Sequence, residues 1–196
     1  WGIGGLVALA EAAPTLLDGL RRLEYRGYDS AGVAIVDGDH IETRKCAGRI
    51  AGLSKLLSEN PAAGHYGISH TRWATHGKPT DQNAHPHFDE SGKLALVHNG
   101  VIENYQQIRE ELLQDSEHHF ASETDSEVLA HLVGKLYDDS AKGVLDPQRH
   151  KALLVEALRK ALQKVIGTYG IAIVHSDIPD FLVGARRGSP LVLGLG

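Results

Sequence analysis

The chain has 196 residues, of which 42% are hydrophobic and 23% charged, and its formal net charge is −5 at pH 7. These proportions predict a soluble α/β protein that forms one domain or part of a larger one. The acidic balance argues against a nucleic acid or an anionic membrane as partner, because both require a clustered basic face. No apolar run approaches the roughly 18 residues of a membrane span. The single cysteine excludes an internal disulfide and fits the reducing cytoplasm.

Strand and helix patterns alternate along the chain without an internal repeat. Pro14 favours the first turn of a helix, the Asp37-Gly38 pair favours a tight hairpin turn, and Ser122 favours a helix N-cap. Apolar runs predict strands at residues 2–9, 33–36, 40–44, 65–71, 93–99, 169–175, 181–186 and 191–196. Leucine spacing predicts helices from Pro14 to the RGYDSAG stretch and at residues 50–57, 102–113, 125–137 and 151–165. Strands at both ends with helices between them predict two sheets with helical layers outside.

A long polar segment, SHTRWATHGKPTDQNAHPHF at residues 69–88, concentrates the side chains that carry chemistry. Such density of polar groups between two strands is typical of a functional loop. Zinc has to be considered, because four histidines could in principle converge on it: His76, His85, His87 and His98. Their spacing matches no structural zinc motif, so we interpret them as ordinary hydrogen-bonding histidines and predict no metal.

The VHNG stretch after the next strand has two interpretations. Asn99-Gly100 is a common turn pair. The same pair could offer a side-chain amide and a backbone N–H to a developing oxyanion. From these residues alone, both interpretations stay open.

Five segments together resemble a known family: LEYRGYDSAG, HTRWATHG, NAHPH, VHNGVIEN and SETDSEV. In them the chain is similar to the glutaminase domains of glucosamine-6-phosphate synthases, which are class II glutamine amidotransferases, and the resemblance spans the whole chain. It implies an α+β fold of the N-terminal-nucleophile type, an αββα sandwich of two stacked, mainly antiparallel sheets between helical layers. It also implies hydrolysis of glutamine to glutamate and ammonia for amino-sugar synthesis, without a cofactor.

Position 1 departs from that family. The resemblance implies a terminal cysteine whose thiol attacks the glutamine amide, with its own α-amino group as the base. Here the residue is Trp1, whose indole has no nucleophilic atom for this step. We therefore expect this copy to be inactive, with the indole either occupying part of the glutamine site or turned out of it. Cys46 lies outside every motif and is expected to be a small hydrophobic residue, not a substitute nucleophile.

The resemblance assigns roles to other residues. Arg72 would hold the α-carboxylate of glutamine, and Asp125 its α-ammonium group. Asn99 and Gly100 would form the oxyanion hole, and Arg26 would position residue 1. The loop that closes over glutamine would include Trp73, Thr75, His76 and Gly77.

Some of these residues also have purely structural interpretations. Arg26 could form a structural ion pair, Trp73 could be a core aromatic, and Asp125 could be a first-turn acid favoured by the helix dipole. We favour the functional interpretation because five separate segments match jointly.

The family's glutaminase domain continues beyond GSPLVLGLG, and the full enzyme adds an isomerase part that binds fructose 6-phosphate. We therefore expect residues 1–196 to be a glutaminase domain truncated at its C-terminus, without the isomerase domain, from an enzyme that is a cytoplasmic homodimer at full length. Two alternatives stay open. One is a glutamine-binding module that has abandoned hydrolysis, and the other is the glutaminase domain of another class II amidotransferase, such as the purine-pathway enzyme, which lacks YRGYDSAG.

Overall fold

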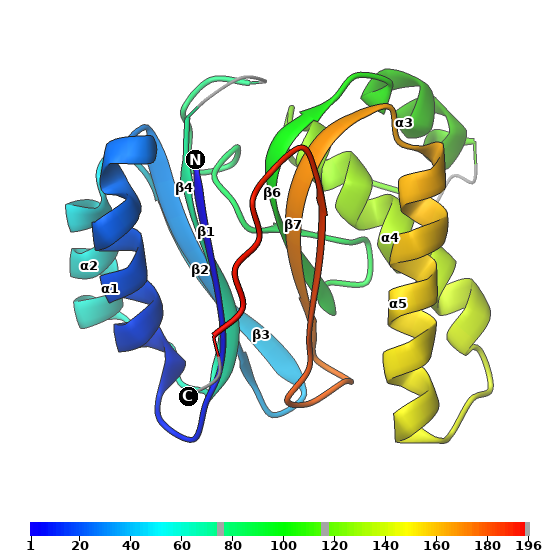
Figure 1. Cartoon of the computed structure of the whole chain (residues 1–196), viewed down its shortest axis with the longest axis horizontal. Coiled ribbons are helices and arrows are strands. Elements are labelled where there is room, and N and C mark those ends of the chain that lie inside the picture. Colours follow the sequence, from blue (N-terminus) through cyan, green and yellow to red (C-terminus); the bar gives the residue numbers. More distant parts are fainter. Residues whose placement is uncertain (74–76, 115–117, 195–196) are drawn as a thin grey trace.

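Two four-stranded sheets face each other in the computed structural model, which describes residues 1–73, 77–114 and 118–194 (Figure 1). The first sheet has the strand order β1-β4-β2-β3 and the second β5-β6-β7-β8. All pairings between these strands are antiparallel. The strands are β1 (Gly2–Val7), β2 (Ser30–Asp37), β3 (His40–Ala47), β4 (Tyr66–Arg72), β5 (His87–Phe88), β6 (Leu94–Ile102), β7 (Gly167–His175) and β8 (Leu182–Arg187).

Helices cover the outer face of each sheet (Figure 1). The first sheet is covered by α1 (Ala12–Leu23) and α2 (Ile50–Glu59), and a short 3-10 helix, Glu24–Arg26, follows α1. The second is covered by α3 (Tyr105–Leu113), α4 (Asp125–Ala141) and α5 (Pro147–Lys164). The predicted αββα sandwich of two antiparallel sheets is therefore confirmed.

Alternation of side chains along each strand divides the core into layers. On β2, Val33 and Ile35 pack against α1 and α2, whereas Ala34 and Val36 face the other sheet. Strand β6 repeats the pattern, with Leu96 towards the helices. The layer between the sheets consists of Ala34, Val36, Tyr66, Ile68, Ala95, Val97, Ala172 and Val174. Its alanines and valines allow the two sheets to lie close together.

Several predicted boundaries differ from the structure. Ile102 ends β6 and does not begin a helix, because residues 94–102 all pair with β7. The hairpin turn consists of Gly38 and Asp39, with Gly38 at φ +59°, so glycine occupies the first turn position as in a type II′ turn. The predicted third strand of the tail is wrong within the described residues, since 191–194 form no strand, and 195–196 lie outside them.

The N-cap of α4 is also corrected. Thr124 caps this helix by accepting a hydrogen bond from the Glu127 N–H, whereas Ser122, the predicted cap, lies two residues further upstream. The Ser122 hydroxyl instead donates to the Glu127 carboxylate at 2.7 Å. Glu127 therefore joins the start of α4 to the segment before it.

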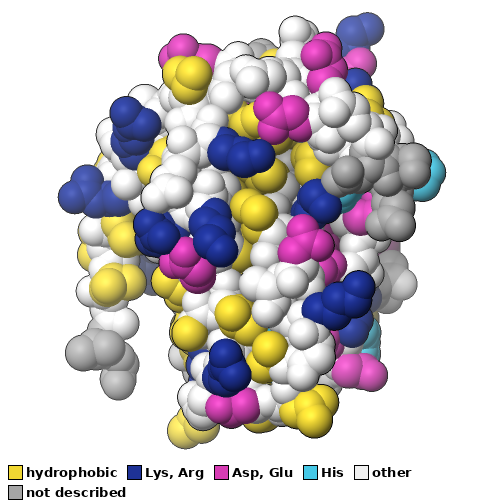
Figure 2. Space-filling model, turned by 90° about the vertical axis from the view of Figure 1, so that its right-hand side faces the viewer, with side chains coloured by type: hydrophobic (Ala, Val, Ile, Leu, Met, Phe, Trp, Pro, Cys, Tyr) yellow, Lys and Arg dark blue, Asp and Glu magenta, His cyan; other side chains and the backbone are white. Residues whose placement is uncertain are grey.

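The outer face of the α3–α5 layer mixes charges of both signs with scattered apolar side chains (Figure 2). Exposed apolar residues here include Leu145, Val155 and Ile166. Within the described ranges, every helix is too short or too polar to cross a bilayer.

The layered core generates a stability prediction. Ile173 of β7 is fully buried, whereas Ile166, just before β7, is 58% exposed. We expect Ile173→Ala to lower the free energy of unfolding by about 2–5 kcal/mol, because it leaves a cavity under α4 and α5. The matched change Ile166→Ala should cost less than about 0.5 kcal/mol. Urea unfolding of both variants checks this, and similar losses in the two would contradict the layer assignment.

Candidate functional site

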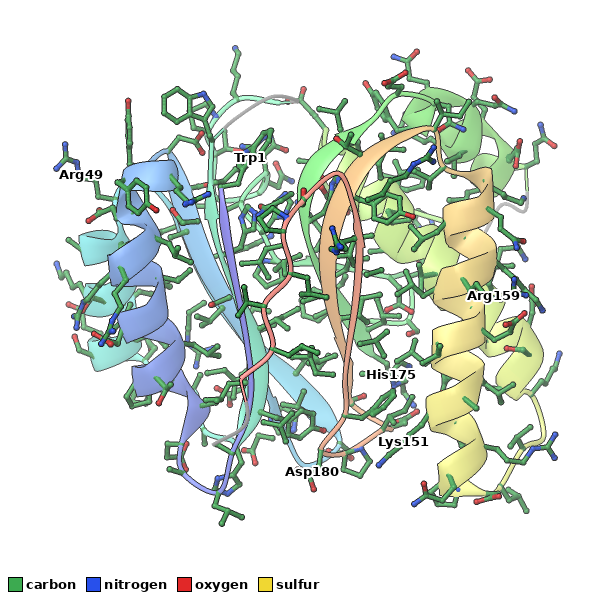
Figure 3. All side chains as sticks on the ribbon, viewed as in Figure 1. Trp1, Arg49, Lys151, Arg159, His175 and Asp180 are labelled. Carbon is green, nitrogen blue, oxygen red and sulfur yellow. The ribbon has the colours of Figure 1, made fainter. Side chains whose placement is uncertain are left out.

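The inner layer ends in polar side chains at one end of the sandwich. Residues two positions apart on a strand share a face. His70 therefore lies on the same face of β4 as Ile68, Asn99 on the same face of β6 as Val97, and Trp1 on the same face as Ile3. Figure 3 shows Trp1 at the start of β1, with His175 and Asp180 towards the opposite end of the sandwich. The site therefore continues the core that packs the two sheets together.

A small cavity of about 10 Å³ lies at this end, with room for one water at most. Four of the predicted residues line it: Trp1, Arg72, Gly100 and Asp125. The rest of its wall comes from His70, His85, His98, Thr124 and Ser126. Residues from β4, β6, α4 and position 1, far apart in the sequence, thus meet around one point.

Two oppositely charged side chains, Arg72 and Asp125, are buried at this cavity. Arg72 Nη2 donates to the carbonyl of Gly77 at 3.3 Å, and Nη1 lies 4.0 Å from Asp29 Oδ1. Asp125 Oδ2 accepts the N–H of Ile102 at 2.9 Å. Burial lowers the pKa of Arg72, and the charges of Asp29 and Asp125 act against that shift. A fixed cation and a fixed anion at one cavity suit the two charged groups of an α-amino acid.

The side-chain amide of Asn99 is oriented by a histidine from the other sheet. Its Oδ1 lies 2.7 Å from His70 Nε2. Burial lowers the pKa of His70 to about 3, so the ring is neutral near pH 7 and donates from Nε2 to the amide oxygen. The amide nitrogen of Asn99 is then left to donate elsewhere. The oxyanion interpretation requires this orientation.

Gly100 can only be glycine in this backbone. Its φ of +138° lies where side chains are strained, and an added Cβ would lie 2.1 Å from the carbonyl oxygen of Thr168. His98, two residues earlier, bonds Ser126 Oγ through Nδ1 at 2.9 Å. The His98 side chain therefore connects the strand just before Gly100 to the start of α4.

Trp1 is held at both ends by backbone carbonyls. Its α-amino group donates to the carbonyl of Arg26, and its indole Nε1 donates to the carbonyl of Trp73. Burial, followed by the positive charge of Arg26, lowers the pKa of the α-amino group. The Arg26 side chain is exposed and lies against the ring of Tyr25, and the hydrogen bond to residue 1 is accepted by the Arg26 backbone carbonyl.

A second hollow, of about 470 Å³, borders the other side of Trp1. It is lined by Trp1, Arg26 and Asn99 together with residues of β7, β8 and the tail after β8. Its volume lies in the range of small-molecule sites. The predicted residues are thus divided between two cavities, and the side chain at position 1 borders both.

The predicted loop residues are only partly described. Thr75 and His76 lie outside the described residues. Trp73 is 52% exposed and meets the ring of Tyr28 edge-on at 5.4 Å, so the core-aromatic interpretation is wrong. Gly77 has φ +77° and contributes its carbonyl to Arg72.

The sequence analysis assigned no individual role to three residues that organise the site: His70, Asn83 and Ser126. Asn83 Nδ2 donates to the carbonyl of Lys78 at 3.0 Å, and its Oδ1 accepts the N–H of Glu123 at 3.0 Å, which links the long loop to the start of α4. His70 could have been found from the period of two, because it shares a face of β4 with Arg72. Ser126 carried no such signal.

Cys46 on β3 does not line either cavity. Burial, and then the charge of Asp81, raise the pKa of its thiol, which disfavours the nucleophilic thiolate. This agrees with the interpretation of Cys46 as a small hydrophobic residue.

The chain is similar in sequence to a known protein family and to several known proteins. Residues 57–144 match the family model described as a glutamine amidotransferase domain. The whole chain is 49% identical to a glutamine–fructose-6-phosphate aminotransferase (isomerizing) of Clostridium tetani and 48% identical to that of Thermus thermophilus. The chain covers 30% of the length of each of these relatives.

Two solved structures share the fold. The glutamine phosphoribosylpyrophosphate amidotransferase from B. subtilis, complexed with ADP and GMP, has a TM-score of 0.68 and 26% identity, over 90% of this chain and 35% of that one. A structure described as the allosteric regulatory enzyme of purine biosynthesis has a TM-score of 0.72 and 27% identity, over 90% and 36%. Sequence identity is therefore higher to the aminotransferases than to the purine enzymes.

The buried histidine at Asn99 generates a pH prediction. Below about pH 6.5 an unfolded histidine takes up a proton, whereas native His70 does so only near pH 3. The contribution of this group to stability is therefore complete above about pH 6.5 and is lost as the pH falls towards 3, at up to about 1.4 kcal/mol per pH unit. We expect His70→Gln to remove that part of the slope, measured by urea unfolding between about pH 7 and 4.5. Equal slopes in the variant and the parent chain would contradict a neutral buried His70.

Proposed function

The chain belongs to the glutamine amidotransferase domains of the glutamine–fructose-6-phosphate aminotransferase family, and we propose that residues 1–196 form its glutamine site, silenced at position 1. The observation that carries the proposal is the meeting of Arg72, Asp125 and Gly100 at one cavity beside Trp1. Arg72 binds the α-carboxylate of glutamine, and Asp125 binds its α-ammonium group.

Asn99 and Gly100 are the oxyanion donors in this proposal. Asn99 contributes its side-chain nitrogen, which the bond from His70 to its oxygen leaves available. Gly100 contributes its backbone N–H. Such donors stabilise the tetrahedral intermediate because they are fixed before charge develops on the amide oxygen.

Position 1 decides whether the site can hydrolyse. Hydrolysis in the family would begin with a thiol that adds to the glutamine amide, releases ammonia and leaves a thioester for water to cleave. The indole of Trp1 has no atom that can add to an amide carbon, and its N–H is bonded to the carbonyl of Trp73. Arg26 acts through its backbone carbonyl, which holds the α-amino group of residue 1. We infer that this chain binds glutamine weakly and does not hydrolyse it.

The remaining members of the site are loop residues. In this proposal Trp73, Thr75, His76 and Gly77 close over bound glutamine. Support comes from Gly77, whose carbonyl accepts a hydrogen bond from Arg72, so the loop and the carboxylate-binding cation are coupled.

The activity of the whole protein is a wider proposal. With a cysteine at position 1, ammonia released here would serve amino-sugar synthesis from fructose 6-phosphate, bound by an isomerase part outside this glutaminase domain, in a cytoplasmic homodimer whose glutamine hydrolysis needs no metal or other cofactor. Its support is the 47–49% identity to several curated aminotransferases, compared with 26–27% to the purine-type structures.

A non-catalytic glutamine-binding module is the second candidate. Trp1 itself favours it, because the amino-acid-binding pair Arg72 and Asp125 is retained where the nucleophile is missing. The two candidates differ in what happens when a thiol is supplied.

Supplying that thiol is the central test. We expect no glutamate release from the Trp1 chain and clear release from Trp1→Cys, after mass spectrometry has confirmed that residue 1 is the terminus in both. In the Trp1→Cys background, Asn99→Ala should reduce kcat by about 10²–10³-fold, because one oxyanion donor is lost. Hydrolysis by the Trp1 chain would refute silencing at position 1. Silence of a folded Trp1→Cys chain would favour the binding module.

A binding test addresses the indole separately. Trp1 borders both cavities, so Trp1→Ala should join them and bind glutamine at least about 10-fold more tightly, equivalent to about 1.4 kcal/mol. Adding Arg72→Met to this variant should abolish the gain, because the carboxylate loses its cation. Calorimetric titration with glutamine measures both, and equal affinity of the parent chain and the Trp1→Ala variant would show that the indole does not block the site.

A further inference from the structure

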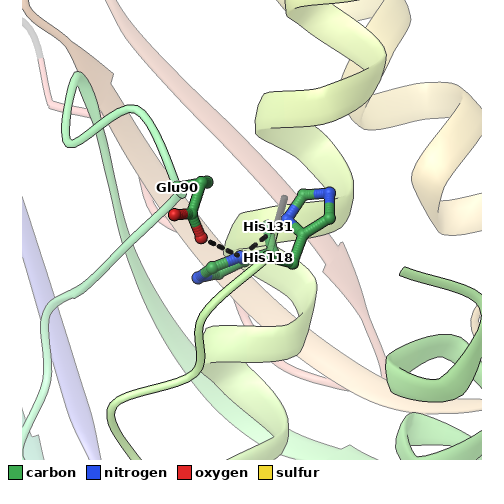
Figure 4. A group of neighbouring side chains, drawn as sticks. All are labelled: Glu90, His118 and His131. Atoms are coloured by element: carbon green, nitrogen blue, oxygen red, sulfur yellow. Dashed lines mark hydrogen bonds and ion pairs between the residues drawn. The ribbon is translucent and has the colours of Figure 1, made fainter. Parts of the chain in front are cut away.

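A cluster of three potential metal ligands lies outside the glutamine site. Glu90 follows β5, His118 lies just before α4, and His131 belongs to the second turn of α4. One ligand atom from each lies within 4.8 Å of the others. Figure 4 shows the three side chains pointing towards one another. We propose that Glu90, His118 and His131 form a zinc site.

The distances fit a tetrahedral ion. His118 Nδ1 lies 3.0 Å from His131 Nδ1, and His131 Nδ1 lies 3.8 Å from Glu90 Oε2. Zinc bonds to nitrogen and oxygen of about 2.0–2.2 Å in a tetrahedron place ligand atoms about 3.3 Å apart. Zinc would therefore replace the histidine–histidine hydrogen bond with only small side-chain movements. Two imidazoles and a carboxylate are also a donor set that zinc takes with an open fourth position.

Neighbouring residues hold the ligands in place. His119 donates its backbone N–H to Glu90 Oε2 at 2.6 Å, and its ring nitrogen Nδ1 lies 3.0 Å from Oε1. The ring of Phe120 packs against that of His131, with centroids 4.5 Å apart. Such outer contacts orient metal ligands in known sites.

The cluster has access to solvent. Glu90 is exposed and His118 half-buried, whereas His131 is buried on α4. A hollow of about 440 Å³ is lined by Glu90 and His131, together with His119 and Glu127. The fourth position would therefore be filled by water, as in a three-ligand site.

Zinc binding would cross-link α4 to the segment that precedes it. Glu127 already accepts the N–H groups of Ala121 and Ser122, at 2.9 and 2.7 Å. Zinc would add a second connection between this segment and α4, one turn further along the helix, and would join both to Glu90. Because α4 begins with Asp125, the ion would stabilise the helix that carries one wall of the glutamine site.

A second group of potential metal ligands, Asp37, His40 and Glu42, provides a control for the zinc experiment. Its ligand atoms also lie within 4.8 Å of one another, but two of its three residues are exposed, and all three belong to the β2–β3 hairpin. The Glu42 carboxylate is already paired with a cation, because Arg44 Nη2 donates to its Oε2 at 3.0 Å. We therefore assign no site there, and His40→Gln removes a histidine without touching the proposed ligands.

The test uses the whole chain, freed of metal with a chelator and titrated with zinc chloride in a calorimeter. We expect one zinc per chain. His118→Ala and Glu90→Gln should each weaken binding at least about 10-fold, and His40→Gln should leave it unchanged. Saturating zinc should raise the melting temperature of the parent chain but not that of His118→Ala, since binding to the native state alone stabilises it. Cobalt(II) should give the visible absorption of a tetrahedral ion.

Three results would overturn the proposal. They are no zinc binding by the folded parent chain, unchanged binding in His118→Ala, and loss of binding in His40→Gln instead. Circular dichroism establishes that each variant is folded. His118 is half-buried and precedes α4, so its variant carries the test even if His131→Ala does not fold.

Discussion

Close packing of the two inner sheet faces is the constraint on which the rest of the structure depends. The layer between the sheets is built largely from alanine and valine, and it brings β4 and β6 near enough for side chains to meet across it. His70 reaches Asn99 at 2.7 Å only because the two strands are so placed. The site is the polar end of this layer, so its geometry is fixed by the same packing that stabilises the fold.

Burying polar groups at that end of the layer costs desolvation free energy, which neutral rings, hydrogen bonds and an ion pair offset. His70, His85 and His87 all have pKa values lowered by burial, and their rings are neutral near pH 7. The two charged residues keep their charges because each has a partner: Arg72 lies near the carboxylate of Asp29, and Asp125 accepts a backbone N–H. Neutral histidines therefore surround one buried cation, Arg72, and one buried anion, Asp125, at this cavity.

Helix α4 connects the two sites. Asp125 at its start borders the cavity, Glu127 anchors the preceding segment, and His131 belongs to the zinc cluster. The two proposed sites therefore lie within the first two turns of one helix, so a ligand bound at either would restrain the same helical segment. Position 1 lies beside the start of this helix, and its side chain borders two cavities.

The sequence by itself determined the αββα class and most of the helices and strands, because alternation and helical spacing are local signals. Its motifs also identified Arg72, Asp125 and the residue at position 1 as belonging together. Only the tertiary structure decided that Ile102 ends a strand, that Thr124 caps α4, and that Trp1 borders two cavities. The pairing of His118 with His131 and Glu90 was equally invisible, since contacts between distant segments depend on how the layers pack and leave no periodic trace in the chain.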